Sequence, residues 1–165
     1  MKFAMYKILF ICTGNICRSP TAEGYMQKIV REAGLQEHIF VDSAGTSSYH
    51  QGDEPDGRSV ECALGHGLDL RHLRSRPLCA DDFAEFDLIL AMDSQNIWNL
   101  EQKRPYGDPR YDRAVVKKLL EYAPAYGTDV PDPYYGDHGF ENVYQMITVA
   151  CDHLLEELKI KACQK

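Results

Sequence analysis

Apolar residues follow first a strand pattern and then a helical pattern in the N-terminal part of the chain. Residues 7–11 are rich in Ile, Leu and Phe, as strands buried on both faces of a sheet are. A polar stretch follows at residues 13–18, and beyond it apolar side chains recur at helical spacing. The stripe that they form consists of Ala22, Tyr25, Met26, Ile29, Val30 and Ala33.

Both ends of this predicted helix carry boundary signals. Ser19 is expected to cap the N-terminus, with Pro20 in the first helical position and Glu23 in the first turn. Gly34 is expected to end the helix, because glycine readily takes the left-handed conformation found there. A short strand at residues 39–41 completes a strand–helix–strand unit, and such a unit implies a parallel sheet.

The same patterns continue along the rest of the chain. They predict helices at residues 58–65, from Asp93 or Ser94 to about residue 103, and at 114–122, a buried strand at 87–91, and polar loops at 43–57 and 123–139. The last helix has one apolar stripe, formed by Phe140, Val143, Tyr144, Ile147, Cys151, Leu154, Leu155 and Leu158. Without a repeat or linker, these elements predict one α/β domain over residues 1–165, a single open sheet with helices on both faces.

Composition and charge narrow the classes of function. At 165 residues with 44% hydrophobic content, the chain can bury a core without disulfides. A net charge of -7 argues against nucleic acids and anionic membranes as main partners, since both need a basic face. Lys7 interrupts the apolar start and no small-residue cleavage site follows, so the expected location is the cytoplasm.

The cysteines are expected to be reduced thiols. They stand at positions 12, 17, 62, 79, 151 and 163, outside any Cys-x-x-Cys pairing. The cysteines and histidines also do not gather at the spacing of zinc ligands along the sequence. We therefore expect neither a metal site nor an organic cofactor.

The segment after the first predicted strand has the residue types of an anion-binding loop. In open α/β sheets, ligands bind at the carboxyl ends of the strands, where this segment begins. Backbone N–H groups that lead into a helix N-terminus attract anions, and Gly14 and Asn15 most easily take the positive φ that such a loop needs. Arg18 supplies a planar fork for two phosphate oxygens. The same donors stabilise the thiolate of Cys12, which is the nucleophilic form of cysteine.

Cys-x5-Arg alone is a weak pattern, so its context matters. Among the cysteines, Cys12 alone has an arginine at position +6, and Ser-Pro then opens a helix. Ser19 could hydrogen-bond the thiolate and help it to leave later in a reaction. The alternative is a buried structural cysteine in a tight turn.

Residues 12–20 resemble the signature of the low-molecular-weight protein tyrosine phosphatases. The resemblance covers nearly the whole chain and includes Asp-Ser-Ala-Gly at 42–45, Phe-Asp-Leu-Ile-Leu-Ala-Met-Asp at 86–93 and Asp-Pro-Tyr-Tyr-Gly at 132–136. It implies a four-stranded parallel sheet flanked by helices, and hydrolysis of phosphotyrosine through a cysteinyl-phosphate on Cys12. A phosphotyrosine protein is the implied partner, a tyrosine kinase is a further candidate, and the expected state is a monomer.

By this resemblance Asp132 matches the general acid, which protonates the leaving phenolate and then acts as a base. The phenol has a pKa of about 10, so a proton donor lowers the barrier to its departure. Nearby Asp129 does not match. From the residues alone, Asp132 next to Pro133 is also a common start of a turn.

Further residues match the walls and supports of the family's pocket. Thr13, Gly14, Asn15, Ile16, Cys17 and Ser19 would bind phosphate, and Tyr49, Tyr134 and Tyr135 would line the substrate pocket. Each of these tyrosines could instead be a half-buried loop anchor. His72 matches a residue that hydrogen-bonds Asn15, while Ser43 and Asp93 match supporting positions. Cys17 could capture an oxidised Cys12 as a disulfide, or simply fill space.

Three other functions fit part of this pattern. Thioredoxin-coupled arsenate reductases share the fold and loop but need two more cysteines close together, and residues 73–93 hold only Cys79. Protein arginine phosphatases are the closer rival. Their loop resembles this one, but it carries Thr at the position of Ile16. A phosphotyrosine-binding module without turnover would be expected to lose Cys12 or Asp132, and both are present.

Overall fold

Four parallel strands form the centre of the fold in the computed structural model, which describes residues 5–134 and 139–163. In the order in which they lie side by side, they are β2 (Ile39–Gly45), β1 (Tyr6–Cys12), β3 (Leu88–Ala91) and β4 (Val115–Lys118). Ile8 of β1 pairs with Val41 on one side and with Leu88 on the other. The next two strands along the chain, β2 and β3, therefore lie on opposite sides of β1. In open α/β sheets this change of direction opens a crevice at the carboxyl ends of the central strands. The expected open four-stranded parallel sheet is confirmed.

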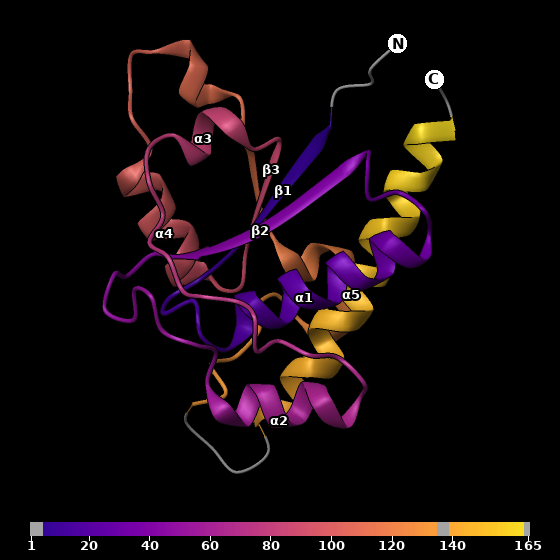
Figure 1. Cartoon of the computed structure of the whole chain (residues 1–165). Coiled ribbons are helices and arrows are strands. Elements are labelled where there is room, and N and C mark those ends of the chain that lie inside the picture. The colour runs from indigo at the N-terminus through magenta and orange to yellow at the C-terminus, as the bar shows by residue number, and fades with distance from the viewer. Residues whose placement is uncertain (1–4, 135–138, 164–165) are drawn as a thin grey trace.

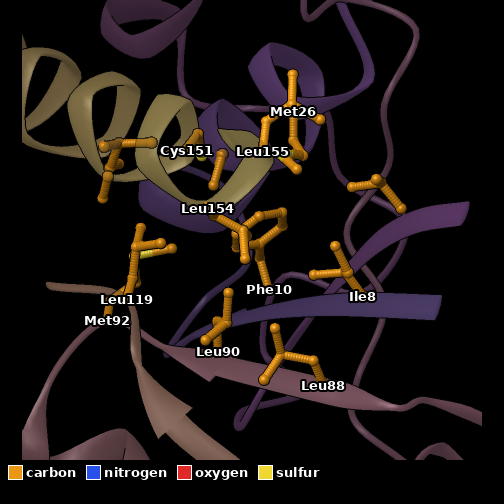
Figure 2. Close-up of a cluster of buried hydrophobic side chains, with 14 of the residues drawn as sticks. Ile8, Phe10, Met26, Leu88, Leu90, Met92, Leu119, Cys151, Leu154 and Leu155 are labelled. Carbon is orange, nitrogen blue, oxygen red and sulfur yellow. The ribbon is translucent and has the colours of Figure 1, made fainter. Parts of the chain in front are cut away.

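Helices α1 (Arg18–Glu32) and α5 (Gly139–Cys163) pack together over one face of the sheet (Figure 1). Side chains of β1 alternate between the faces, so Ile8 and Phe10 point toward these two helices (Figure 2). Leu154 of α5 and Met26 of α1 contribute to the same buried cluster. This core fixes the direction in which α1 leaves the end of β1.

The opposite face is covered by α3 (Asp82–Glu85), α4 (Ser94–Lys103) and the 3-10 turn η1 (Pro109–Asp112). Here Leu9 and Ile11 of β1 pack with Phe83 and Leu100. Beyond the sheet, α2 (Gly57–Gly65) lies against α5 (Figure 1). Two more 3-10 turns, η2 (Leu119–Tyr122) and η3 (Pro124–Tyr126), follow β4. No helix within the described ranges is both long and apolar enough to cross a bilayer.

The predicted helix at residues 114–122 is wrong. Residues 115–118 form the edge strand β4 and pair with β3, and only the next residues turn into the 3-10 helix η2. Val115 is half exposed, so the strand lacks the buried alternation that marks strands in a sequence. Hydrogen bonds to β3 favour the extended form of Val115 and Val116, and Leu119 and Leu120 then turn into the core.

Two boundaries at the sheet's carboxyl edge also differ from the prediction. The second strand extends to Gly45, because the polar residues 42–45 pair with the last four residues of β1. Helix α1 begins at Arg18, and its N-terminal cap residue Cys17 makes no side-chain capping bond. Ser19 is therefore not the cap, and its hydroxyl bonds Cys12 and Asn15 instead. The predicted end of the helix at Gly34 is confirmed, since Gly34 has a φ of 72° directly after the cap residue Ala33.

Candidate active site

The loop between β1 and α1 turns sharply around the sulfur of Cys12. Asn15 has a φ of 58° and is the one non-glycine residue with positive φ in the described part of the chain. This conformation directs the Asn15 backbone N–H to Cys12 Sγ at 3.3 Å. An N–H that faces the sulfur stabilises its anionic form, as does the positive end of the helix α1 dipole.

The loop also needs the small residue that follows Ala44. Gly45 ends β2, and a Cβ added to it would lie 2.7 Å from the carbonyl oxygen of Thr13 and 3.1 Å from the Asn15 side chain. Any other residue would therefore push the loop away from the sheet. This contact explains the glycine at the end of the Asp-Ser-Ala-Gly stretch in β2.

Cys12 is 2% exposed and lies at the floor of the loop. Its Sγ is 3.0 Å from the Ser19 hydroxyl, which lies in the first turn of α1. Asn15 Nδ2 donates to that hydroxyl oxygen at 2.7 Å, so the Ser19 proton is free to point to the sulfur. The two residues together supply hydrogen bonds that favour a thiolate.

The Asn15 carboxamide is held by residues from three segments of the chain. Besides its bond to Ser19, Nδ2 donates to Ser43 Oγ at 2.9 Å, and Oδ1 accepts from the Arg76 backbone N–H at 3.0 Å. His72 was predicted to make this contact, but its side chain is exposed. That prediction is wrong, because the chain before β3 reaches Asn15 through the backbone of Arg76 and leaves His72 at the surface.

Ser43, which accepts a hydrogen bond from Asn15, also contacts a buried carboxyl group. Its hydroxyl donates to Glu23 Oε1 at 2.6 Å, and Gln27 Nε2 donates to the other oxygen at 3.0 Å. Burial raises the pKa of Glu23 to about 7. From the sequence, Glu23 was assigned only to the first helical turn, so its contact with Ser43 was missed, since no sequence signal shows that it faces the loop.

Arg18 is 2% exposed, and its guanidinium is fixed on one side. Nη1 donates to Asp93 Oδ2 at 2.7 Å and to the carbonyl of Val130 at 3.0 Å. Asp93 also caps helix α4 by accepting from Asn96 N–H, so one carboxylate orients both the arginine and the helix. The predicted supporting contact of Asp93 is therefore present.

The far end of the guanidinium faces the candidate acid. Arg18 Nη2 lies 4.0 Å from Asp132 Oδ2, and the side chain of Asp132 is 43% exposed. The other oxygen of Asp132 accepts from the Tyr134 backbone N–H at 3.0 Å, which fixes the carboxylate in a turn. Asp132 can therefore begin a turn and still present a carboxyl group to the hollow.

A hollow of about 490 Å³ opens above the loop. Cys12, Arg18 and the loop residues from Thr13 to Cys17 other than Asn15 line it, together with Ser47, Tyr49, His50, Asp132 and Tyr134. Tyr49 lines the hollow with a side chain that is 86% exposed. Tyr135 lies outside the described residues. His50 was not predicted to line this hollow, although it directly follows Tyr49.

This arrangement suits attack by sulfur on a tetrahedral anion, followed by protonation of the group that leaves. The nucleophile, an arginine fork and a carboxyl group face one hollow, which is the requirement for phosphoryl transfer to a cysteine. The geometry therefore points to the class of cysteine-dependent phosphatases.

Comparisons with known proteins identify the family. Residues 7–164 match the model of the low molecular weight phosphotyrosine protein phosphatases. A protein-tyrosine-phosphatase of this type from Synechocystis is 47% identical over 92% of the chain and 96% of its own length. The low molecular weight phosphotyrosine protein phosphatase of Homo sapiens is 40% identical, over 93% of the chain and 96% of its own length. The chain belongs to this family, whose members are cysteine-dependent protein-tyrosine phosphatases.

Solved structures agree with the fold. A protein tyrosine phosphatase from Entamoeba histolytica, crystallised with Hepes in its active site, superposes with a TM-score of 0.85 at 37% identity, covering 95% of this chain and 99% of that one. A Drosophila arginine phosphatase also superposes with a TM-score of 0.85, at 35% identity over 93% of this chain and 98% of its own. Cys12 and Arg18 occupy the loop position after β1 that is typical of the family.

Proposed function

We propose that this chain hydrolyses phosphotyrosine in proteins, with Cys12 as nucleophile. The Sγ thiolate attacks phosphorus, the P–O bond to the tyrosine breaks, and Asp132 gives its proton to the departing phenolate oxygen. Water then attacks the cysteinyl-phosphate while Asp132 takes a proton from it, and inorganic phosphate leaves. Ser19 stabilises the thiolate that is formed again in this second step.

Arg18 has the role of holding the phosphate in both steps. Asp93 and Val130 occupy its Nη1, so the fork presents Nη2 and the remaining N–H groups to the hollow. Loop N–H groups supply the other donors, since Asn15 already directs its N–H to the position of the sulfur. Fixed donors stabilise the charge of the transition state without having to reorient.

The observation that carries this proposal is the pairing of Cys12 Sγ with Ser19 Oγ at 3.0 Å beneath a hollow that Arg18 and Asp132 also line. Replacing Cys12 by Ser tests it. Turnover of phosphotyrosine should be lost, while inorganic phosphate still binds, because Arg18 and the loop N–H groups remain. Activity within about tenfold of wild type would contradict the assignment of the nucleophile.

The proposed substrate class follows from the shape of the hollow. Cys12 is 2% exposed, and Tyr134 and Asp132 line the hollow above it, which favours a phosphate carried at the end of a long side chain. Ile16 adds an apolar surface suited to a phenyl ring. Both favour phosphotyrosine over phosphoserine, whose side chain is shorter.

One rival substrate has a specific observation in its favour, namely the likeness to an arginine phosphatase. The deciding experiment compares phosphotyrosine, phosphoarginine, and arsenate with thioredoxin at equal concentration. We expect efficient turnover of phosphotyrosine only. A larger kcat/KM for phosphoarginine would change the substrate while leaving the roles of Cys12, Arg18 and Asp132 intact.

We further propose that the enzyme acts as a monomer in the cytoplasm on phosphotyrosine proteins, tyrosine kinases among them. The acidic net charge of -7 supports soluble protein partners rather than nucleic acid or anionic lipid. Sedimentation of the purified chain tests the monomer, and a Cys12→Ser variant used as a substrate trap tests the partners.

A further inference from the structure

Three side chains with metal-ligating atoms meet between helices α2 and α5, away from the hollow described above. Cys62 Sγ lies 3.3 Å from Glu141 Oε2, and His66 Nε2 lies 2.8 Å from Glu141 Oε1. The ligand atoms of all three residues lie within 4.8 Å of one another. We propose that Cys62, His66 and Glu141 form a binding site for a zinc ion.

The spacing of these atoms is close to what a zinc ion requires. Bonds of about 2.0–2.3 Å in a tetrahedral site place neighbouring ligand atoms roughly 3.3–3.6 Å apart. The Cys62–Glu141 pair is already at that separation, and the His66–Glu141 pair is slightly closer. The ligand atoms of the third pair, Cys62 and His66, lie within 4.8 Å of each other, and side-chain rotation has to bring them to the same separation.

The two helices hold the ligands on facing surfaces. Cys62 and His66 are four positions apart at the end of α2, so they project from the same side of it. Glu141 lies in the first turn of α5, opposite them. The backbone therefore brings together three residues that are far apart in the sequence, which is why their linear spacing gave no zinc signal.

Neighbouring side chains fix two of the three ligands. The His66 ring stacks on Tyr144 at 4.2 Å between centroids and 11° between planes, and Tyr144 is itself buried in the core next to Ala63. Gln145 Nε2 donates to Glu141 Oε1 at 3.3 Å. Supporting contacts of this kind orient ligands before a metal arrives.

The chemistry of the trio also suits zinc. Thiolate, imidazole and carboxylate are the three side-chain ligands that zinc accepts, and a water molecule can complete the tetrahedron. Without a metal, Cys62 and His66 direct protons to one carboxylate, and the cation replaces these protons as the shared partner. The Cys62 S–H bond breaks, the sulfur electron pair binds Zn²⁺, and that proton leaves to solvent. The proton on His66 Nε2 is exchanged through solvent for one on Nδ1, so that the neutral imidazole presents the Nε2 lone pair to the ion.

Zinc binding should be measured in a Cys12→Ser background, so that the active-site thiolate cannot take up the ion. Calorimetry with Zn²⁺ should give one ion per chain, with a proton released. Co²⁺ in its place should give the charge-transfer absorption of a thiolate ligand. Adding Cys62→Ser, His66→Gln or Glu141→Gln to this background should weaken the Kd by at least about tenfold.

Cys79→Ser, in the same background, is the matched control because Cys79 is an exposed cysteine outside the trio. It should bind zinc as its parent does. Zinc should also raise the Tm of the parent but not that of the Cys62→Ser variant. Absence of stoichiometric binding, or binding that the Cys62→Ser and His66→Gln changes leave intact, would overturn the proposal.

Discussion

Ser43 Oγ donates a hydrogen bond to Glu23 Oε1 across 2.6 Å, and this contact joins a buried carboxyl group to the loop that surrounds Cys12. The same hydroxyl oxygen accepts from Asn15 Nδ2, which in turn contacts Ser19, the neighbour of the Cys12 sulfur. Three hydrogen-bonded residues, Ser43, Asn15 and Ser19, thus link a buried titratable group to the nucleophile.

Glu23 should make stability depend on pH. Burial raises its pKa from 4.5 to about 7, so between these values the folded protein keeps a proton that the unfolded chain has lost. The stabilisation is complete below about pH 4.5 and is lost as the pH rises through 7. A shift of this size corresponds to a change on the order of 3 kcal/mol.

Urea unfolding of wild type and Glu23→Gln at pH 5 and pH 8 measures this effect. The variant cannot ionise at this position, so its free energy of unfolding should fall less between the two pH values. Glu37→Gln removes an exposed carboxyl group and serves as the control. Equal pH dependence in wild type and Glu23→Gln would show that Glu23 titrates normally.

Arg18→Lys should lower kcat/KM by about 100-fold or more, although the positive charge is kept. An ammonium group is a point charge and cannot bond Asp93, Val130 and two phosphate oxygens in one plane. Steady-state kinetics with a phosphotyrosine peptide measures the loss. A variant that retained most of the activity would remove the phosphate-holding role from Arg18.

Asp132→Ala should slow the release of poor leaving groups by roughly 100-fold and that of activated ones much less, because only the former need a proton. A series of aryl phosphates with different phenol pKa values tests this. Asp129→Ala is the control, since Asp129 is paired with Lys118 at 2.9 Å and does not line the hollow. Equal losses across the series would argue against an acid at position 132.

Brief peroxide treatment should form a disulfide between Cys12 and Cys17 that thiols reverse. Peroxide converts the Cys12 thiolate to a sulfenic acid, and the Cys17 thiol condenses with it and releases water. Burial raises the pKa of Cys17 to about 12, so Cys17 remains a thiol and Cys12 is oxidised first. Peptide mapping checks this, with Cys17→Ser as the control that should progress to sulfinic acid. Finding only sulfinic Cys12 in the wild type would exclude the disulfide.

Ile16→Thr should shift the substrate preference toward phosphoarginine. Ile16 lines the hollow, and a hydroxyl there could help to place a polar guanidinium. One altered side chain is expected to change relative transition-state binding by about 1–3 kcal/mol. The ratio of kcat/KM for phosphotyrosine and phosphoarginine measures the shift, and an unchanged ratio would show that position 16 does not select the substrate.

The sequence by itself determined the elements that have strong local signals. The apolar run before Cys12, the helical stripe of α1 with its glycine end, and the stripe of α5 were all predictable, because burial imposes a period on the side chains. The loop from Cys12 to Ser19 was predictable as well, since its residue types follow from the conformation and charge of an anion-binding turn.

Only the tertiary structure decided which distant side chains meet. Residues 115–118 form a strand because they pair with β3. Asn15 is held by Arg76 and Ser43 rather than by His72. The positions of Cys62 and His66 opposite Glu141 likewise depend on how α2 packs on α5. Such contacts depend on packing between segments far apart in the chain, and local periodicity carries no information about that packing.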